Sequence, residues 1–420
     1  MSLRAAGLPL LLSGLALGAN TGDLARVAVH GNPVDAQKAR AELRAMGPSG
    51  LEALFATKAD AARLAAAPKD AALTVAAAID AVARQKDASF SRLYWYTSLD
   101  EARAAATATG RPILSLRLLG DLGEDLSCAN SRFFRTALYA NAEVSEALRE
   151  GFVLHWESVR PVPRITIDYG DGRRIERTIT GNSLHYVLTS RAEVVDVLPG
   201  VYGPDAFLSE IRLAAAIAKS LPAGAKERSA ALRRHHVDRL AAGTGALVPA
   251  RLDERSKALM RLKTRGVYEG DSFGKAVEAF EAVMTEDMTH NETVLRPTLH
   301  RWLTRVDAGP SNLAAFTDRI YDEVFLTPRR DPWMGLVPPL VYAALDGEGR
   351  RAGNAPSDQA LLQVGPLPSA MAAGALALSK IGGERAALSS LVRPGPKVAA
   401  LPPATGIPGA VPTTISPRSR

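Results

Sequence analysis

Cysteine is the residue that this chain of 420 residues has least of, because Cys128 is the only one. A single cysteine excludes a disulfide within the chain. It leaves a mixed disulfide, a bridge between two copies or an inert buried thiol. Aromatic residues are also scarce, at 5%, whereas alanine is abundant. This composition predicts many helices that contact one another through small side chains.

Basic charge is not massed in any block, although the formal net charge is +7. Arginine alternates with acidic residues, which is typical of a solvated surface, so we expect no nucleic-acid partner. The chain also lacks a glycine-rich phosphate loop and the HExxH and GxSxG motifs. These absences remove the commonest sequence signals of nucleotide binding, zinc-protease and serine-hydrolase chemistry.

Long apolar runs are missing beyond the first residues. Residues 1–19 carry one basic residue, Arg4, and an apolar stretch of the length found in signal peptides. If this stretch is a secretory signal, the protein is periplasmic or secreted. If it is a buried N-terminal helix, the protein is cytoplasmic. No later stretch has the length and apolar character expected of a transmembrane segment.

Proline, glycine and changes of periodicity divide the rest of the chain. Residues 23–88 predict a small helical module, and residues 93–221 alternate between strand-like and helical patterns. Residues 228–350 predict a mostly helical C-terminal domain, in which Ser229 is expected to cap the first helix. The proline-rich residues 391–420 predict a disordered tail.

The residues around Cys128 have the most definite pattern. A nearly continuous apolar run, Pro112–Leu119, predicts a strand that is covered on both faces. A polar loop then brings Cys128 to the start of a helix, which ends near Gly151 before a second apolar run, Phe152–Trp156. The helix dipole stabilises a thiolate at a helix N-terminus, so this unit predicts a candidate nucleophile.

Further motifs lie at regular places around this unit. They are SLDEARAAATATGRP before the first strand, Cys128-Ala-Asn-Ser131 at the helix start, then Tyr139, Asn141, Val144 and Phe152-Val153. With these motifs, residues 97–213 resemble the thioredoxin-like superfamily in a CxxS variant. The resemblance implies an α/β fold, in which a central thioredoxin-like domain is flanked by the helical N-terminal module and the mostly helical C-terminal domain.

The resemblance also implies roles for single residues. Cys128 takes the place of the family's nucleophilic cysteine, and Ser131 takes that of its second cysteine. Ser183 stands at the position of the cis-proline that faces the nucleophile. Residues 164–179, with an Asp-Gly turn between alternating residues, predict a hairpin inserted into the domain.

Two functions from different classes remain open. In the first, Cys128 and Ser131 are catalytic, and the serine donates a hydrogen bond to the sulfur. Such a monothiol site traps a partner protein or a thiol but cannot resolve the mixed disulfide. The residues expected in its substrate groove are Gly181, Asn182, Ser183 and His185.

In the second function, the fold is a non-catalytic scaffold for binding or assembly, and the cysteine is buried. The two functions differ in the surroundings of the sulfur. A sulfur open to solvent favours thiol chemistry, and a sulfur buried under its neighbours favours the scaffold.

The sequence predicts neither a metal site nor a cofactor. His235 and His236 are adjacent, so they point in different directions on a helix. His290 and His300 are ten residues apart, which places them about 80° out of phase on an ideal helix. No local spacing of two histidines therefore suggests a pair of ligands.

Overall fold

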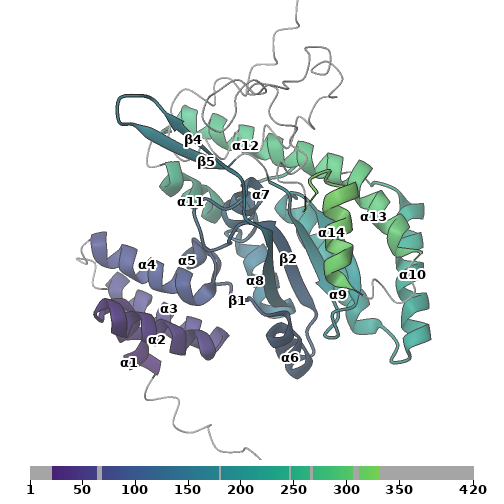
Figure 1. Cartoon of the computed structure of the whole chain (residues 1–420), viewed down its shortest axis with the longest axis horizontal. Coiled ribbons are helices and arrows are strands. Elements are labelled where there is room, and N and C mark those ends of the chain that lie inside the picture. Colours follow the sequence, from purple (N-terminus) through teal and green to yellow (C-terminus); the bar gives the residue numbers. More distant parts are fainter. Residues whose placement is uncertain are drawn as a thin grey trace, which may run out of the picture.

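A computed structural model describes residues 21–63, 69–178, 181–245, 247–264, 268–305, 312–328 and 330. These residues form a mixed α/β structure with one five-stranded sheet, a separate two-stranded hairpin and helices on both sides of the sheet (Figure 1). The predicted signal stretch, residues 1–19, and the predicted tail, residues 391–420, lie outside the described residues.

The N-terminal helices form a small bundle of their own (Figure 1). They are α1 (Thr21–His30), α2 (Pro33–Ala45), α3 (Pro48–Arg63), α4 (Lys69–Ala83) and the short α5 (Ala88–Ser91). The Asn32 side chain caps α2, because its oxygen accepts the backbone N–H groups of Val34 and Asp35. The bundle has a separate apolar core that includes Leu43, Leu51 and Ile79.

The five-stranded sheet has the order β1-β3-β2-β6-β7. Its strands are β1 (Trp95–Tyr96), β2 (Ile113–Leu119), β3 (Val153–Arg160), β6 (Leu184–Leu188) and β7 (Val194–Pro199). β3 pairs in parallel with both β1 and β2, whereas β6 pairs antiparallel with β2 and β7. Every residue of β2 is buried, which confirms the strand predicted from its apolar run.

Four helical segments lie in the connections between the strands of this sheet or directly after its last strand. They are α6 (Leu99–Thr109), α7 (Ala129–Phe133) continued by a π-helical turn (Phe134–Leu138), α8 (Ala142–Gly151) and α9 (Pro204–Ser220). Ser98 caps α6, because its hydroxyl accepts the Glu101 N–H. The predicted insertion is confirmed as the hairpin of β4 (Arg164–Asp168) and β5 (Arg174–Thr178), which projects from the body of the molecule (Figure 1).

The C-terminal helices share one apolar core with the sheet. They are α10 (Ala225–Ala242), α11 (Glu254–Thr264), α12 (Asp271–His290), a π-helical turn (Asn291–Leu295), α13 (Arg296–Leu303) and α14 (Leu313–Glu323). Phe280, Leu299 and Ile320 are among their core residues. The predicted cap at Ser229 is wrong, because α10 begins at Ala225 and Ser229 lies inside it.

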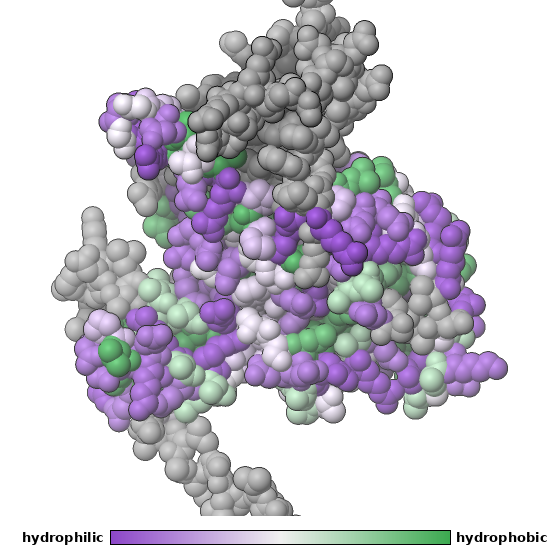
Figure 2. All heavy atoms as spheres, viewed as in Figure 1, coloured by the Kyte–Doolittle hydropathy of each residue, from purple (hydrophilic) through white to green (hydrophobic). Residues whose placement is uncertain are grey.

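Hydrophilic side chains predominate on the face shown in Figure 2, and hydrophobic ones form only small patches there. None of the described helices has both the length and the hydrophobicity needed to cross a bilayer.

Candidate functional site

Cys128 lies where the strand-to-helix connection after β2 ends. Its backbone N–H donates to the Leu119 carbonyl oxygen at 3.2 Å, which ties the loop back to the end of the strand. Cys128 itself is the N-cap residue of α7. The connection therefore brings the thiol to a helix start, as the sequence predicts.

The Cys128 side chain is 0% exposed. Charged and aromatic groups surround it from three elements. Burial lowers the pKa of Arg132 to about 10, and the charge of Cys128 acts in the opposite direction. Burial raises the pKa values of Tyr139 and Tyr321 well above the usual value, and the charge of Cys128 adds to both. Arg132 of α7, Tyr139 after the π-helical turn and Tyr321 therefore lie near enough to interact electrostatically with the thiol, which belongs to the buried apolar core.

Ser131 does not take the position expected of a partner to the sulfur. Its hydroxyl oxygen lies 2.6 Å from the Ser127 hydroxyl and 2.8 Å from the carbonyl oxygen of Cys128. Within the described residues, no hydrogen bond joins it to the thiol. In this structure the Ser131 hydroxyl therefore bonds to the Ser127 side chain and to the backbone of the first turn of α7.

The loop before β6 packs directly onto α7. A Cβ atom on Gly181 would lie 2.8 Å from the Ala129 Cβ and 2.9 Å from the Asn130 backbone nitrogen. Such distances are too short for any side chain, so the glycine permits the contact. The loop and the thiol-bearing helix start are therefore neighbours, as the thioredoxin-like resemblance implies, but no space for a substrate separates them.

The α14 segment closes the same loop from the other side. The Tyr321 hydroxyl donates to the Asn182 carbonyl oxygen at 2.9 Å, and the Asn182 amide donates to the Thr327 hydroxyl at 2.7 Å. The four residues expected in an open groove are all buried, namely Gly181, Asn182, Ser183 and His185. These residues are therefore closed to solvent in this structure, because Tyr321 and Thr327 bond to the loop, and their role in a substrate groove stays a prediction.

His185 contacts aromatic residues of the core, and none of its hydrogen bonds in the described residues reaches Cys128. Its Nε2 lies 2.7 Å from the Tyr139 hydroxyl, and its ring packs against Phe134 and Phe207. Burial lowers the pKa of His185 to about 3, so the imidazole is neutral at neutral pH. Its Nδ1 has no hydrogen-bond partner among the described residues. The ring is thus a core residue of the sheet face covered by α9.

A second polar cluster lies under α10 and α13, far from Cys128 in sequence. It joins Asp196 of β7 to His235 and His236 of α10 and to Arg296 and His300 of α13, all buried. Arg296 donates to Asp196 at 2.9 Å, and His235 Nε2 lies 3.2 Å from the same carboxylate oxygen.

The histidines that meet in this cluster are not the pairs suggested by their spacing in the sequence. His236 Nδ1 lies 3.1 Å from His300 Nδ1, although 64 positions separate the two residues. Asp196, His236 and His300 each offer one ligand atom, and these three atoms lie within 4.8 Å of one another. No spacing along the chain signals this group, because packing of α10 against α13 creates it.

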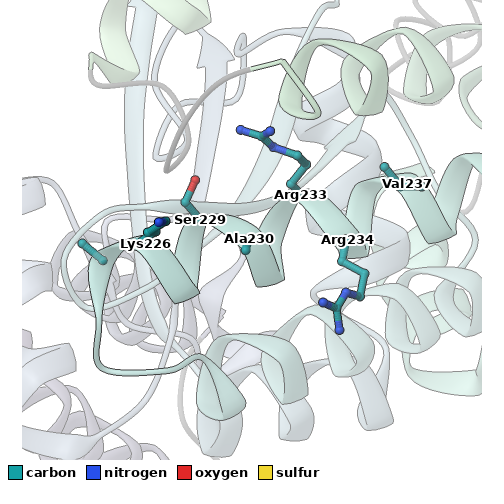
Figure 3. A pocket seen from close by; sticks show the side chains of 7 residues that line it. Lys226, Ser229, Ala230, Arg233, Arg234 and Val237 are labelled. Carbon is teal, nitrogen blue, oxygen red and sulfur yellow. The ribbon is translucent and has the colours of Figure 1, made fainter.

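An open hollow of about 680 Å³ lies on α10. The side chains that line it include Lys226, Arg233 and Arg234, together with Ser229 and Val237 (Figure 3). Basic groups thus surround the opening, but the hollow has no buried polar group that would fix a ligand. We assign no chemistry to it.

Protein-family models, curated proteins and solved structures were compared with the chain, and none of them matches it. The geometry described above is therefore the basis for a function.

Proposed function

We propose that the protein is a non-catalytic binding or assembly protein whose central sheet is a thioredoxin-like scaffold. The observation that carries the proposal is the enclosure of Cys128, which is 0% exposed. The family's nucleophile has to reach a disulfide or thiol of another molecule, and a buried structural cysteine is inert toward such groups.

The order and direction of the strands support the thioredoxin-like part of the proposal. β2, the Cys128 loop, α7, α8 and the parallel strand β3 follow one another as the resemblance implies. After the inserted hairpin, β6 and β7 form an antiparallel pair that leads into α9. In this proposal the scaffold keeps Cys128 at the start of α7, and α14 packs on the loop that would otherwise face a substrate.

The hairpin of β4 and β5 supports the binding part of the proposal. Ile165, Ile167 and Tyr169 alternate along it and are 36%, 43% and 48% exposed. A projecting hairpin with apolar side chains on one face is a typical surface for a protein partner. The partner is expected to pack on this apolar face.

Two measurements test this function together. The first is the rate at which a small alkylating reagent modifies Cys128 in the folded and in the urea-unfolded protein. We expect the folded rate to be lower by at least about a thousandfold, as for a buried thiol. A rate close to that of a free cysteine contradicts the scaffold function.

The second measurement compares the proteins that co-purify with the wild type, with Cys128→Ala and with Ile167→Asp. A non-catalytic scaffold retains its partners when the thiol is removed. It loses them when a charge is placed on the hairpin. Loss of partners in Cys128→Ala, with partners retained in Ile167→Asp, contradicts the proposal.

A specific observation supports monothiol exchange as the second candidate. The partly buried Arg132 lies in the first turn of α7, next to Cys128, and the two charges interact. A basic side chain beside a cysteine is typical of reactive thiols. In this reaction the Cys128 thiolate attacks a partner disulfide. One S–S bond forms, another breaks, and the partner's second sulfur leaves as thiolate. This function requires α14 to move away first, so rapid alkylation of the folded protein is its signature.

A further inference from the structure

We propose that Asp196, His236 and His300 form an interior binding site for one divalent metal ion of the zinc class. The three residues come from β7, α10 and α13. The side chains are 1%, 1% and 4% exposed. Two imidazoles and a carboxylate are a common ligand set of zinc and of other borderline divalent ions.

The spacing of the imidazole nitrogens fits a shared ion. His236 Nδ1 and His300 Nδ1 are 3.1 Å apart. Two nitrogens bound to one zinc ion at about 2.0–2.1 Å lie about 2.9 Å apart at a right angle and about 3.3 Å apart in a tetrahedron. The observed distance falls between these values, so the two rings need almost no movement to bind one ion.

The approach of the two Nδ1 atoms points to the same site. Two neutral imidazoles can meet in this way only if one Nδ1 carries the proton and the other accepts it. A metal ion between two unprotonated Nδ1 atoms takes a lone pair from each, so the same approach also fits coordination.

The carboxylate has capacity for a cation on one oxygen. Asp196 Oδ2 accepts Arg296 and lies next to His235, whereas Oδ1 accepts the Val197 backbone N–H at 2.7 Å.

The site is structural in character, because its ligands join the sheet to two helices that follow it much later in the chain. Three protein ligands leave a fourth tetrahedral position for water or for a small shift of His235, which already lies beside Asp196. A bound ion would fix α10 and α13 onto β7, and metal binding would appear as folding stability.

The test uses full-length protein without a histidine tag, stripped of metal with a chelator. Zn²⁺ is added, and the dialysed protein is analysed for metal content and melting temperature. We expect about one zinc per chain and a rise in melting temperature with Zn²⁺ but not with Mg²⁺, which prefers oxygen ligands. Co²⁺ should give the visible absorption of a tetrahedral site.

Three variants locate the site. His236→Gln and His300→Gln should weaken zinc binding by more than the roughly 10- to 100-fold that loss of an outer contact costs. His290→Gln is the matched control, because this histidine of α12 lies outside the cluster, and it should bind zinc like the wild type. Circular dichroism checks that each variant is folded.

X-ray absorption at the zinc edge uses the wild type and needs no substitution. It therefore still tests the ligands when a variant does not fold. The expected spectrum has two imidazole ligands and no sulfur. Less than about a fifth of an ion per chain, a sulfur ligand, or unchanged binding in folded His236→Gln and His300→Gln would overturn the proposal. Each of these outcomes contradicts coordination by one ion between the two helices.

Discussion

Two features of Cys128 have opposite consequences for its chemistry. Its place at the start of α7, beside Arg132, is typical of reactive cysteines. Its complete burial removes the path that a substrate needs. The proposed scaffold function rests on burial as the stronger of the two features.

Cys128 itself gives a stability prediction. Cys128→Ala removes a buried sulfur and should lower the free energy of unfolding by about 1 kcal/mol. Cys128→Ser places a hydroxyl at the N-cap of α7, where it can accept an N–H of the first turn, so it should be more stable than the alanine variant by about 0.5–2 kcal/mol. Urea unfolding of both variants measures the difference. An alanine variant at least as stable as the serine variant would show that the hydroxyl does not cap the helix.

The buried histidines predict a dependence of stability on pH. Burial lowers the pKa of His185 to about 3, and burial followed by the charge of Arg117 lowers that of His155 to about 3. In the unfolded chain each histidine titrates near its ordinary value of about 6.5. Below that pH the unfolded state takes up protons that the folded state excludes, so stability falls as the pH decreases from about 6.5.

Each of these histidines contributes at most about 1.4 kcal/mol per pH unit in this range. Unfolding by urea between pH 7.5 and 5.5 should show this slope, and it should be smaller in His155→Gln. His290→Gln is the control variant for this slope, because His290 is only partly buried in the folded state. An equal slope in the wild type and His155→Gln would show that His155 does not stay neutral.

At the scale of elements, α14 determines what the sheet can do. Its buried residues, Phe316, Thr317, Ile320 and Tyr321, follow helical spacing and face the sheet. The Thr317 hydroxyl lies 3.0 Å from the Tyr186 hydroxyl of β6. The helix therefore lies on the sheet beside the loop that precedes β6.

Weakening α14 should expose the thiol. Ile320→Ala removes a side chain that is 0% exposed and should destabilise the packing by about 2–5 kcal/mol. We expect alkylation of Cys128 in the folded protein to become faster by at least about tenfold, because α14 opens locally more often. The surface variant Glu323→Gln is the control and should leave the rate unchanged. An equal rate in both variants would mean that α14 does not cover the thiol.

At the scale of the whole molecule, two apolar cores are present in the described residues. One belongs to the N-terminal bundle, and the other is common to the sheet and the C-terminal helices. Polar contacts join the bundle to the sheet. For example, the Trp156 indole donates to the Arg84 carbonyl oxygen at 2.9 Å, and the Trp95 indole donates to Gln85 at 2.8 Å.

The common core predicts that residues 93–221 do not fold alone. This fragment loses Arg296, which compensates the buried charge of Asp196, and the apolar cover that Phe280 and Ile320 provide. Residues 21–330 should fold cooperatively. Near-ultraviolet circular dichroism and urea unfolding of both fragments measure this. A cooperative transition in residues 93–221 would show that the sheet has a sufficient core of its own.

The sequence alone determined the local elements. β2 was predicted from its apolar run, and the β4–β5 hairpin from its turn and alternation. Such signals are readable because they depend on neighbours along the chain. The helix start that carries Cys128 was predicted on the same grounds.

Only the tertiary structure decided what surrounds the functional residues. The closure of the expected groove depends on Tyr321 and Thr327, which lie more than a hundred positions beyond Asn182. The approach of His236 to His300 depends on how α10 packs against α13. No periodicity or spacing encodes such contacts, because they arise from the burial of apolar faces at a distance. Composition and pattern therefore determined the parts of this protein, and packing decided which of its polar groups meet and which of them reach water.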